Sequence, residues 1–373
     1  MFRSFFSRRI IAPAVLAAVS AAGGLFPVQS AIQRVVNVYN WSDYLDPAAL
    51  DDFTKTTHIR VRYDTFDNSE TLDAKLLAGN SGYDVVVPTG YFLERQIKAG
   101  VFRKLDKSKL PNLGNAWPEI TNRLATYDPG NQYAVNYMWG TTGIGFNVKQ
   151  VQKVLGGNAA IDSWDYVFDP AKITKFKDCG IHMLDSADDI MPAALHYLGL
   201  NPNSTDPADL QKAADLLIKI RPNVRKFHSS EYINGLATDE ICFVVGFSGD
   251  IKQAQRRAAE AKSGIEIGYA IPKEGAQLWF DNLAIPKDAP DEGEAHAFIN
   301  YLLDPEVAAR NSNFVSYANG NLASQKFINK SILDDRGIYP DAATMAKLYT
   351  ILAHDLKTER LVNRLWTRIK TGL

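Results

Sequence analysis

The chain has 373 residues, with 41 lysines and arginines against 42 aspartates and glutamates, and a formal net charge of −1. This balance, without any basic run, argues against a nucleic-acid partner and is compatible with a cationic ligand. The chain is too long for one small core and fits two lobes.

Residues 1–30 have the features of a secretion leader. Three arginines precede an apolar stretch at residues 10–25, and Val28-Gln29-Ser30 offers small residues for cleavage. Ser7-Arg8-Arg9 also resembles part of a twin-arginine signal. We favour the general secretory route, because no cofactor motif demands export in the folded state. Cleavage would leave about 340 residues with 38 basic and 42 acidic side chains, a net charge of −4.

Strands alternate with helices along most of the chain, which is typical of an α/β fold. The predicted strands are residues 35–39, 83–88, 133–148, 242–246, 265–272 and 278–286. The predicted helices are residues 47–57, 69–78, 92–99, 207–220, 251–262, 292–303, 305–312, 342–353 and 359–370. Residues 111–132 are rich in Asn, Gly and Pro and are predicted to be irregular.

The two cysteines, Cys179 and Cys242, each lie at the edge of a predicted strand in an apolar neighbourhood. An even count in an exported protein favours one disulfide between them. Two buried free thiols are the alternative.

Aromatic rings and polar side chains recur at the ends of the predicted strands. Asn40-Trp41-Ser42-Asp43-Tyr44 follows the first strand, and a ring beside a carboxylate suits an ammonium group. Any one such segment is explained by helix capping or core packing. Together they favour a shared cleft for an elongated cation with an ammonium at each end, because open α/β sheets bind ligands at the carboxyl ends of their strands. The other five segments are residues 89–92, 185–189, 247–250, 279–281 and 317–319.

Motifs for other chemistries are incomplete. Gly246-Phe247-Ser248-Gly249-Asp250 lacks the second glycine of a nucleophile elbow, and residues 140–145 have glycines in the wrong order for a dinucleotide loop. No histidine array has zinc spacing, and Asp188-Asp189 lacks the acid spacing of a calcium loop. We therefore expect no catalytic residue, metal or cofactor. A secreted hydrolase using His228, Ser229 or Ser248 is the alternative, although His228 is better explained as a hydrogen-bonded loop histidine.

Five motifs carry a resemblance that extends in order from about residue 35 to the end of the chain. They are Asn40-Trp41-Ser42-Asp43-Tyr44, Tyr83-Asp84-Val85-Val86-Val87-Pro88, Thr141-Thr142-Gly143-Ile144-Gly145-Phe146-Asn147, Ile271-Pro272-Lys273-Glu274-Gly275-Ala276 and Tyr317-Ala318-Asn319-Gly320-Asn321. The chain resembles the periplasmic polyamine-binding proteins of ABC importers. The resemblance implies a monomeric periplasmic protein that passes its ligand to a membrane permease driven by a cytoplasmic ATPase. A sensor subunit of the same fold is an alternative.

The fold implied by the resemblance is a two-lobed Venus-flytrap (type II-like) binding protein with the ligand cleft between its lobes. The chain crosses between the lobes in this fold. We expect residues 31–138 and 252–302 in the first lobe, and residues 139–251 and 303–373 in the second. The cysteine pair resembles a feature of the putrescine branch of the family.

Carried over residue by residue, the ligand site of the family comprises Trp41, Ser42, Asp43, Tyr44, Thr89, Tyr91, Asp189, Phe247, Asp250, Trp279, Asp281 and Tyr317. Asp281 and Asp250 are expected to hold amino groups, with Asp189 at the far end. Trp41, Phe247 and Trp279 are expected to enclose the aliphatic stem.

Three positions depart from the family pattern. The family usually has tryptophan where this chain has Phe247 and glutamate where it has Asp189, whereas Tyr91 matches the spermidine branch. The resemblance therefore implies putrescine as first ligand and spermidine as second.

Overall fold

The computed structural model describes residues 34–157 and 160–372, so the predicted leader lies outside the described residues. The strands are β1 (Val35–Trp41), β2 (Arg60–Phe66), β3 (Val85–Val86), β4 (Ala134–Asn147), β5 (Ile181–Met183), β6 (Lys226–Phe227), β7 (Phe243–Phe247), β8 (Ile267–Ala270), β9 (Leu278–Ala284) and β10 (Ala318–Asn319). The α-helices are α1 (Pro47–Thr57), α2 (Ser69–Leu77), α3 (Gly90–Lys98), α4 (Pro118–Leu124), α5 (Val148–Leu155), α6 (Asp165–Phe168), α7 (Pro170–Ile173), α8 (Ala187–Tyr197), α9 (Pro207–Ile220), α10 (Tyr232–Ala237), α11 (Ser248–Glu260), α12 (Glu292–Leu302), α13 (Pro305–Val315), α14 (Lys330–Leu333), α15 (Ala342–Met345) and α16 (Leu356–Thr371). Short 3-10 helices are η1 (Lys107–Lys109), η2 (Pro111–Asn115), η3 (Thr174–Phe176), η4 (Arg221–Asn223) and η5 (Leu322–Phe327). Across these described segments, every helix is too short or too polar to span a bilayer.

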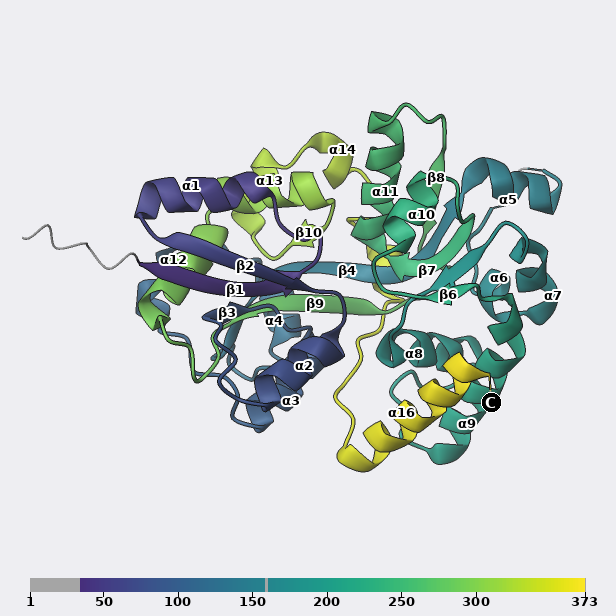
Figure 1. Cartoon of the computed structure of the whole chain (residues 1–373), viewed down its shortest axis with the longest axis horizontal. Helices are drawn as coiled ribbons and strands as arrows, with labels where there is room; N and C mark the ends of the chain where they lie inside the picture. Colours follow the sequence, from purple (N-terminus) through teal and green to yellow (C-terminus); the bar gives the residue numbers. More distant parts are fainter. Residues whose placement is uncertain (1–33, 158–159, 373) are drawn as a thin grey trace, which may run out of the picture. The chain divides into compact units, whose positions relative to one another are not determined.

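One long strand, β4, belongs to the sheets of both lobes. The strands follow the order β2-β1-β3-β9-β4-β7-β5-β6, and β8 and β10 also pair with β4. The first part of β4, up to Thr141, pairs with β9, and the part from Thr142 pairs with β7. Figure 1 shows β4 extending from the lobe that contains β1 and β2 into the lobe that contains β7.

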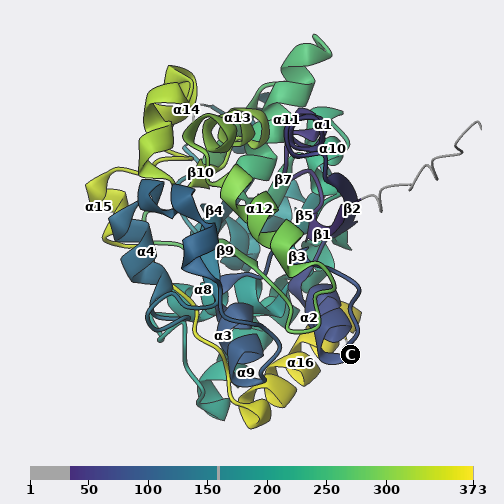
Figure 2. The same ribbon diagram turned by 90° about the vertical axis from the view of Figure 1, so that its left-hand side faces the viewer.

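The first lobe has helices on both faces of its sheet. Val36 and Val38 of β1 pack with Phe53 of α1, whereas Val86 of β3 packs with Leu93 of α3 in a separate cluster. Figure 2 shows α1 and α13 on one side of these strands and α2 and α3 on the other. The β1–β2 and β1–β3 pairs are parallel, so their carboxyl ends meet at one edge of the sheet.

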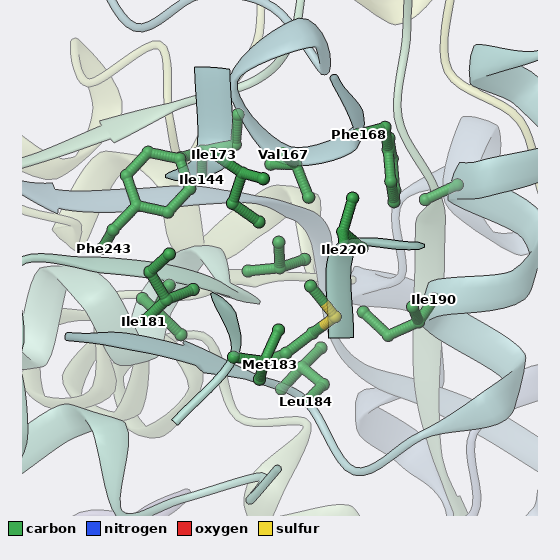
Figure 3. Packing of buried hydrophobic residues seen from close by; sticks show 14 of the residues in the cluster. Ile144, Val167, Phe168, Ile173, Ile181, Met183, Leu184, Ile190, Ile220 and Phe243 are labelled. Atoms are coloured by element: carbon green, nitrogen blue, oxygen red, sulfur yellow. The ribbon is translucent and has the colours of Figure 1, made fainter. Parts of the chain in front are cut away.

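The second lobe is built around β5 and β7, which are parallel neighbours. Figure 3 shows Ile181 and Met183 of β5 and Phe243 of β7 packed with Ile220 from the end of α9. The C-terminal helix α16 returns to this lobe and adds Trp366 to the same cluster. Each lobe therefore consists of a sheet packed against helices, and the ends of its strands can contribute side chains to a ligand site.

The packing differs from the predicted lobe division in two places. Helix α11 and strand β8, expected in the first lobe, contribute Ile251 and Ile267 to the core cluster of the second. Helix α13 and its C-terminal extension, expected in the second lobe, contribute Val315 and Tyr317 to a core cluster of the first. The chain therefore crosses between the lobes at later points in the sequence than the predicted division places them, after β8 rather than before α11 and after α13 rather than before it.

Two local predictions are wrong. Residues 111–132 contain α4, whose Ile120 and Leu124 are buried against the first lobe. The helix predicted over residues 342–353 ends at Met345. The chain then runs beside β9, where Tyr349 donates its N–H to Ala276 and accepts one from Leu278. By contrast α1 begins as predicted, with the Asp46 side chain accepting from the Ala48 N–H at 3.0 Å.

The predicted disulfide is confirmed. Cys179 and Cys242 are bonded, with their Cα atoms 5.5 Å apart and a sequence separation of 63. Cys242 is completely buried, and the bond fixes the start of β7 to the segment between η3 and β5.

Reduction of this disulfide is expected to lower the melting temperature by several degrees. Closing a loop of 63 residues stabilises the folded chain by about 4 kcal/mol in the chain-entropy description. Differential scanning calorimetry with and without reductant measures the shift. The Cys179→Ser, Cys242→Ser double variant is the control and should not respond to reductant. Equal melting temperatures for oxidised and reduced wild type would contradict the expected stabilisation.

Candidate ligand-binding cleft

A cavity lies where strand ends of the two lobes meet, and its empty volume, including the part open to solvent, is about 670 Å³. Eleven of the twelve predicted site residues line it, namely Trp41, Ser42, Tyr44, Thr89, Tyr91, Asp189, Phe247, Asp250, Trp279, Asp281 and Tyr317. They come from segments that are far apart in the sequence. The strand-end pattern therefore locates a real concave surface.

Asp281 lies on β9 and lines the cavity. Its side chain accepts hydrogen bonds from the hydroxyls of Thr89, at 2.5 Å, and Tyr44, at 2.9 Å. The residue is only 5% exposed, and burial raises the pKa of its carboxyl to about 7, against the opposing effect of the two hydroxyls. A positive charge placed beside this carboxyl would favour its ionised form.

Asp250 lies in the first turn of α11 and joins the two lobes through hydroxyl groups. It accepts from Tyr317, of the first core, and from Tyr232, of the second, each at 2.7 Å. Burial raises the pKa of its carboxyl to about 6. A Cβ atom at Gly249 would lie 2.4 Å from the Tyr317 ring, so only glycine allows this approach. The Tyr44 and Tyr317 rings are in edge contact, with centroids 5.1 Å apart, which connects the surroundings of Asp250 to those of Asp281.

Asp189, at the start of α8, is the third buried carboxylate. It accepts from the hydroxyls of Ser186 and Thr142, each at 2.7 Å. Burial raises the pKa of this carboxyl as well. Within residues 34–157 and 160–372, none of Asp189, Asp250 and Asp281 forms a salt bridge to a lysine, arginine or histidine. Three buried acids thus share one cavity without a protein cation.

Aromatic rings cover the wall between these acids. The Trp279 ring packs edge-on against the Phe247 ring, with centroids 5.6 Å apart, and against the Tyr317 ring, with centroids 5.4 Å apart. Trp41 packs on Phe66 and donates its indole N–H to the Val87 carbonyl at 3.0 Å, which fixes the ring. Fixed rings of this kind can contact alkyl groups and attract cations.

Asp43 is the predicted site residue that the structure does not bring into the cavity. Its carboxylate pairs with Arg257 of α11 at 2.8 Å, and its backbone adopts a left-handed conformation with φ of 55°. It does not cap α1 either, because Asp46 does so. Sequence adjacency to Trp41 and Tyr44 did not reveal that the turn directs this side chain elsewhere.

Several residues that line the cavity were not predicted from the sequence as ligand-binding residues: Asp67, Asn68, Ser69, Glu70, Ser186, Ser229, Ser230 and Gln277. Ser186 lies inside a segment that was noticed for its acids. Strand periodicity could have identified Gln277, because Gln277, Trp279 and Asp281 are every second residue and therefore share one face of the strand. Residues 67–70 follow β2 and extend into the first turn of α2. They include no aromatic residue, so they do not show the combination of a ring and a polar side chain that was used to predict the site.

The alternative chemistries gain no support from the geometry. His228 accepts main-chain hydrogen bonds from Ser230 and Glu231 at its Nδ1, which is the structural role of a loop histidine. The Ser248 hydroxyl accepts from the Thr141 N–H at 3.4 Å. In the part of the chain that the structure describes, no cluster of three or more His, Cys, Asp or Glu side chains is placed to hold a metal ion.

Comparison with known proteins agrees with this geometry. Residues 48–337 match the family described as bacterial extracellular solute-binding protein. The putrescine-binding periplasmic protein SpuD of Pseudomonas aeruginosa is 51% identical over 96% of this chain and 98% of its own length. The putrescine-binding periplasmic protein PotF of Escherichia coli is 48% identical over 94% of this chain and 96% of its own.

A solved structure, a putative spermidine/putrescine ABC transporter from Listeria monocytogenes, is similar with a TM-score of 0.81 and 33% identity, covering 91% of this chain and 100% of that one. These matches confirm the two-lobed binding-protein fold. The chain belongs to the bacterial extracellular solute-binding proteins.

Proposed function

We propose that this protein captures a polyamine in the periplasm, putrescine first and spermidine second, and delivers it to the permease of an ABC importer. The observation that carries the proposal is the set of three buried carboxylates, Asp189, Asp250 and Asp281, that share a cavity without a cationic partner. Relatives named for putrescine binding align over almost the whole chain. The role requires binding and release and no covalent step.

A diamine with two charged ends matches the distribution of charge in the cavity. Asp281 and Asp250 lie near the contacting Tyr44 and Tyr317 rings and would hold charged amino groups of the ligand. Asp189 would assist by binding an amino group at the far end. Charge-assisted hydrogen bonds to carboxylates are short and strong, and the flanking rings add attraction to the cations and cover the alkyl stem.

The position of the cavity between lobes gives a mechanism for capture. Tyr317 and Trp279 belong to a core of the first lobe, while Tyr232 belongs to the core of the second. A ligand that contacts both sets stabilises the arrangement in which the lobes are closed around it. Strands β4 and β9 lie where the sheets of the two lobes join. The chain would therefore bend at these strands when the lobes close.

The expected partners follow from the same proposal. The permease and the ATPase of an importer would receive the ligand, and the relatives with periplasmic names support export. We propose that the mature protein is a monomer released by cleavage near residue 30.

Asp281→Asn is expected to weaken putrescine binding by at least about 2 kcal/mol, because a desolvated ammonium would lose its counter-charge. Isothermal titration calorimetry measures the loss. The control is Asp178→Asn, which makes the same chemical change on an exposed residue outside the cavity. Wild-type affinity in Asp281→Asn would remove Asp281 from the site.

Tyr91 is expected to set ligand length. The residue is 9% exposed and lines the cavity. Burial raises the pKa of its hydroxyl, and the negative charges of nearby Asp188 and Asp189 raise it further. The ring and hydroxyl can therefore contact an additional amine at the Asp189 end. We expect spermidine to bind within roughly 1–2 kcal/mol of putrescine, the scale of one polar or aromatic contact.

Tyr91→Ser should shift the preference toward putrescine, because a small residue leaves that space to water. Competition calorimetry with both amines on wild type and Tyr91→Ser measures the ratio, and Tyr91→Phe separates the hydroxyl from the ring. An affinity ratio that stays constant across the three proteins would show that Tyr91 does not determine length.

A further inference from the structure

Gln277 is a buried polar residue in the cavity that the sequence resemblance does not assign. It is only 2% exposed, yet its side-chain Oε1 accepts no hydrogen bond from any described residue. A buried acceptor without a partner is unfavourable and uncommon in folded proteins. Nothing in the packing of the described residues compensates for it.

The backbone fixes where this side chain lies. Gln277 immediately precedes β9, and alternation places it on the same side as Trp279 and Asp281, all three of which line the cavity. The intervening Leu278 and Phe280 are buried in a core cluster on the other side. The wall therefore presents a carboxylate, a ring and an amide in line along one strand.

Gln277 also lies at the end of the cavity that contains Asp189. Thr142 donates its N–H to the Gln277 carbonyl at 3.1 Å, and its hydroxyl donates to Asp189 at 2.7 Å. Tyr349 pairs with Gln277 through the backbone on the other side, so the main chain at this point is held from both directions. A main chain held in this way keeps its position when a ligand enters.

We propose that Gln277 is a ligand-binding residue whose Oε1 accepts a hydrogen bond from the ammonium group held by Asp189. This inference rests on the proposed function. The three N–H donors of an ammonium point in different directions, so they cannot all reach one carboxylate, and a further acceptor can bind the remaining donor. A cation offers donors only, so it selects the oxygen of the amide rather than its NH2 group. The ligand would thus supply the partner that the protein lacks, and Gln277 would add specificity at the far end of the cleft.

The test uses Gln277→Met, which keeps a similar length and removes the acceptor. We expect the affinity for putrescine to fall about tenfold, the effect of one hydrogen bond to a charged group. The melting temperature of the ligand-free variant should stay equal to that of wild type or rise, because an unpaired buried polar group has been removed. A purely structural role for Gln277 predicts the opposite pattern, a lower melting temperature with unchanged affinity.

Gln277→Glu is the matched variant that retains an acceptor at the same position, and it should bind putrescine at least as tightly as wild type at about pH 8, because the bound ammonium favours the ionised form of the added carboxyl. Equal affinities for wild type and Gln277→Met would overturn the inference while leaving the proposed function intact. Failure of wild type to bind any polyamine would instead refute the proposed function itself. Calorimetry and thermal unfolding of the three proteins separate these results.

Discussion

The burial of three carboxylates without a protein cation is the constraint on which the rest of the site depends. Removing an ionised carboxylate from water costs several kcal/mol unless charge and hydrogen bonds compensate. Hydroxyl groups supply the hydrogen bonds here, and two of them serve each acid. The compensating charge is what the protein lacks, so the site is arranged for a cationic ligand and binding contributes to the stability of the closed form.

The fold determines how these acids come together. Parallel strands place their carboxyl ends at one edge in each lobe, and each edge contributes a turn that carries an acid or a ring. Strand β4 belongs to both sheets, and side chains from the two edges line one cavity. Glycine at position 249 then permits Tyr317 to reach Asp250 from the other lobe. The carboxylates are therefore positioned by the backbone, and the rings and hydroxyls follow from that placement.

Much of the site could be predicted from sequence because many of its members share a local pattern, a ring or a polar side chain beside the end of a strand, although Trp279 and Asp281 lie inside β9. The alternation of strands and helices could also be predicted from the sequence. The pairing of segments that are far apart in the sequence could not. Residues 342–353 have helical composition, but pairing of Tyr349 with the edge at residues 276–278 keeps most of them extended. The assignment of α11 and α13 to lobes depends on packing between distant segments, and the direction of Asp43 depends on a left-handed turn and on Arg257. Local pattern carries no information on these three features.

The most direct measurement is the number of protons released when putrescine binds. Calorimetry at about pH 6.5 in two buffers of different ionisation enthalpy gives this number. Asp281, with a pKa of about 7, and Asp250, with a pKa of about 6, are partly protonated before binding and should ionise beside the dication. The account predicts net proton release at about pH 6.5 that falls toward zero at about pH 8, and affinity that decreases as the pH drops through these pKa values. Binding heats that do not depend on the buffer at either pH would contradict the claim that buried carboxylates hold the ligand.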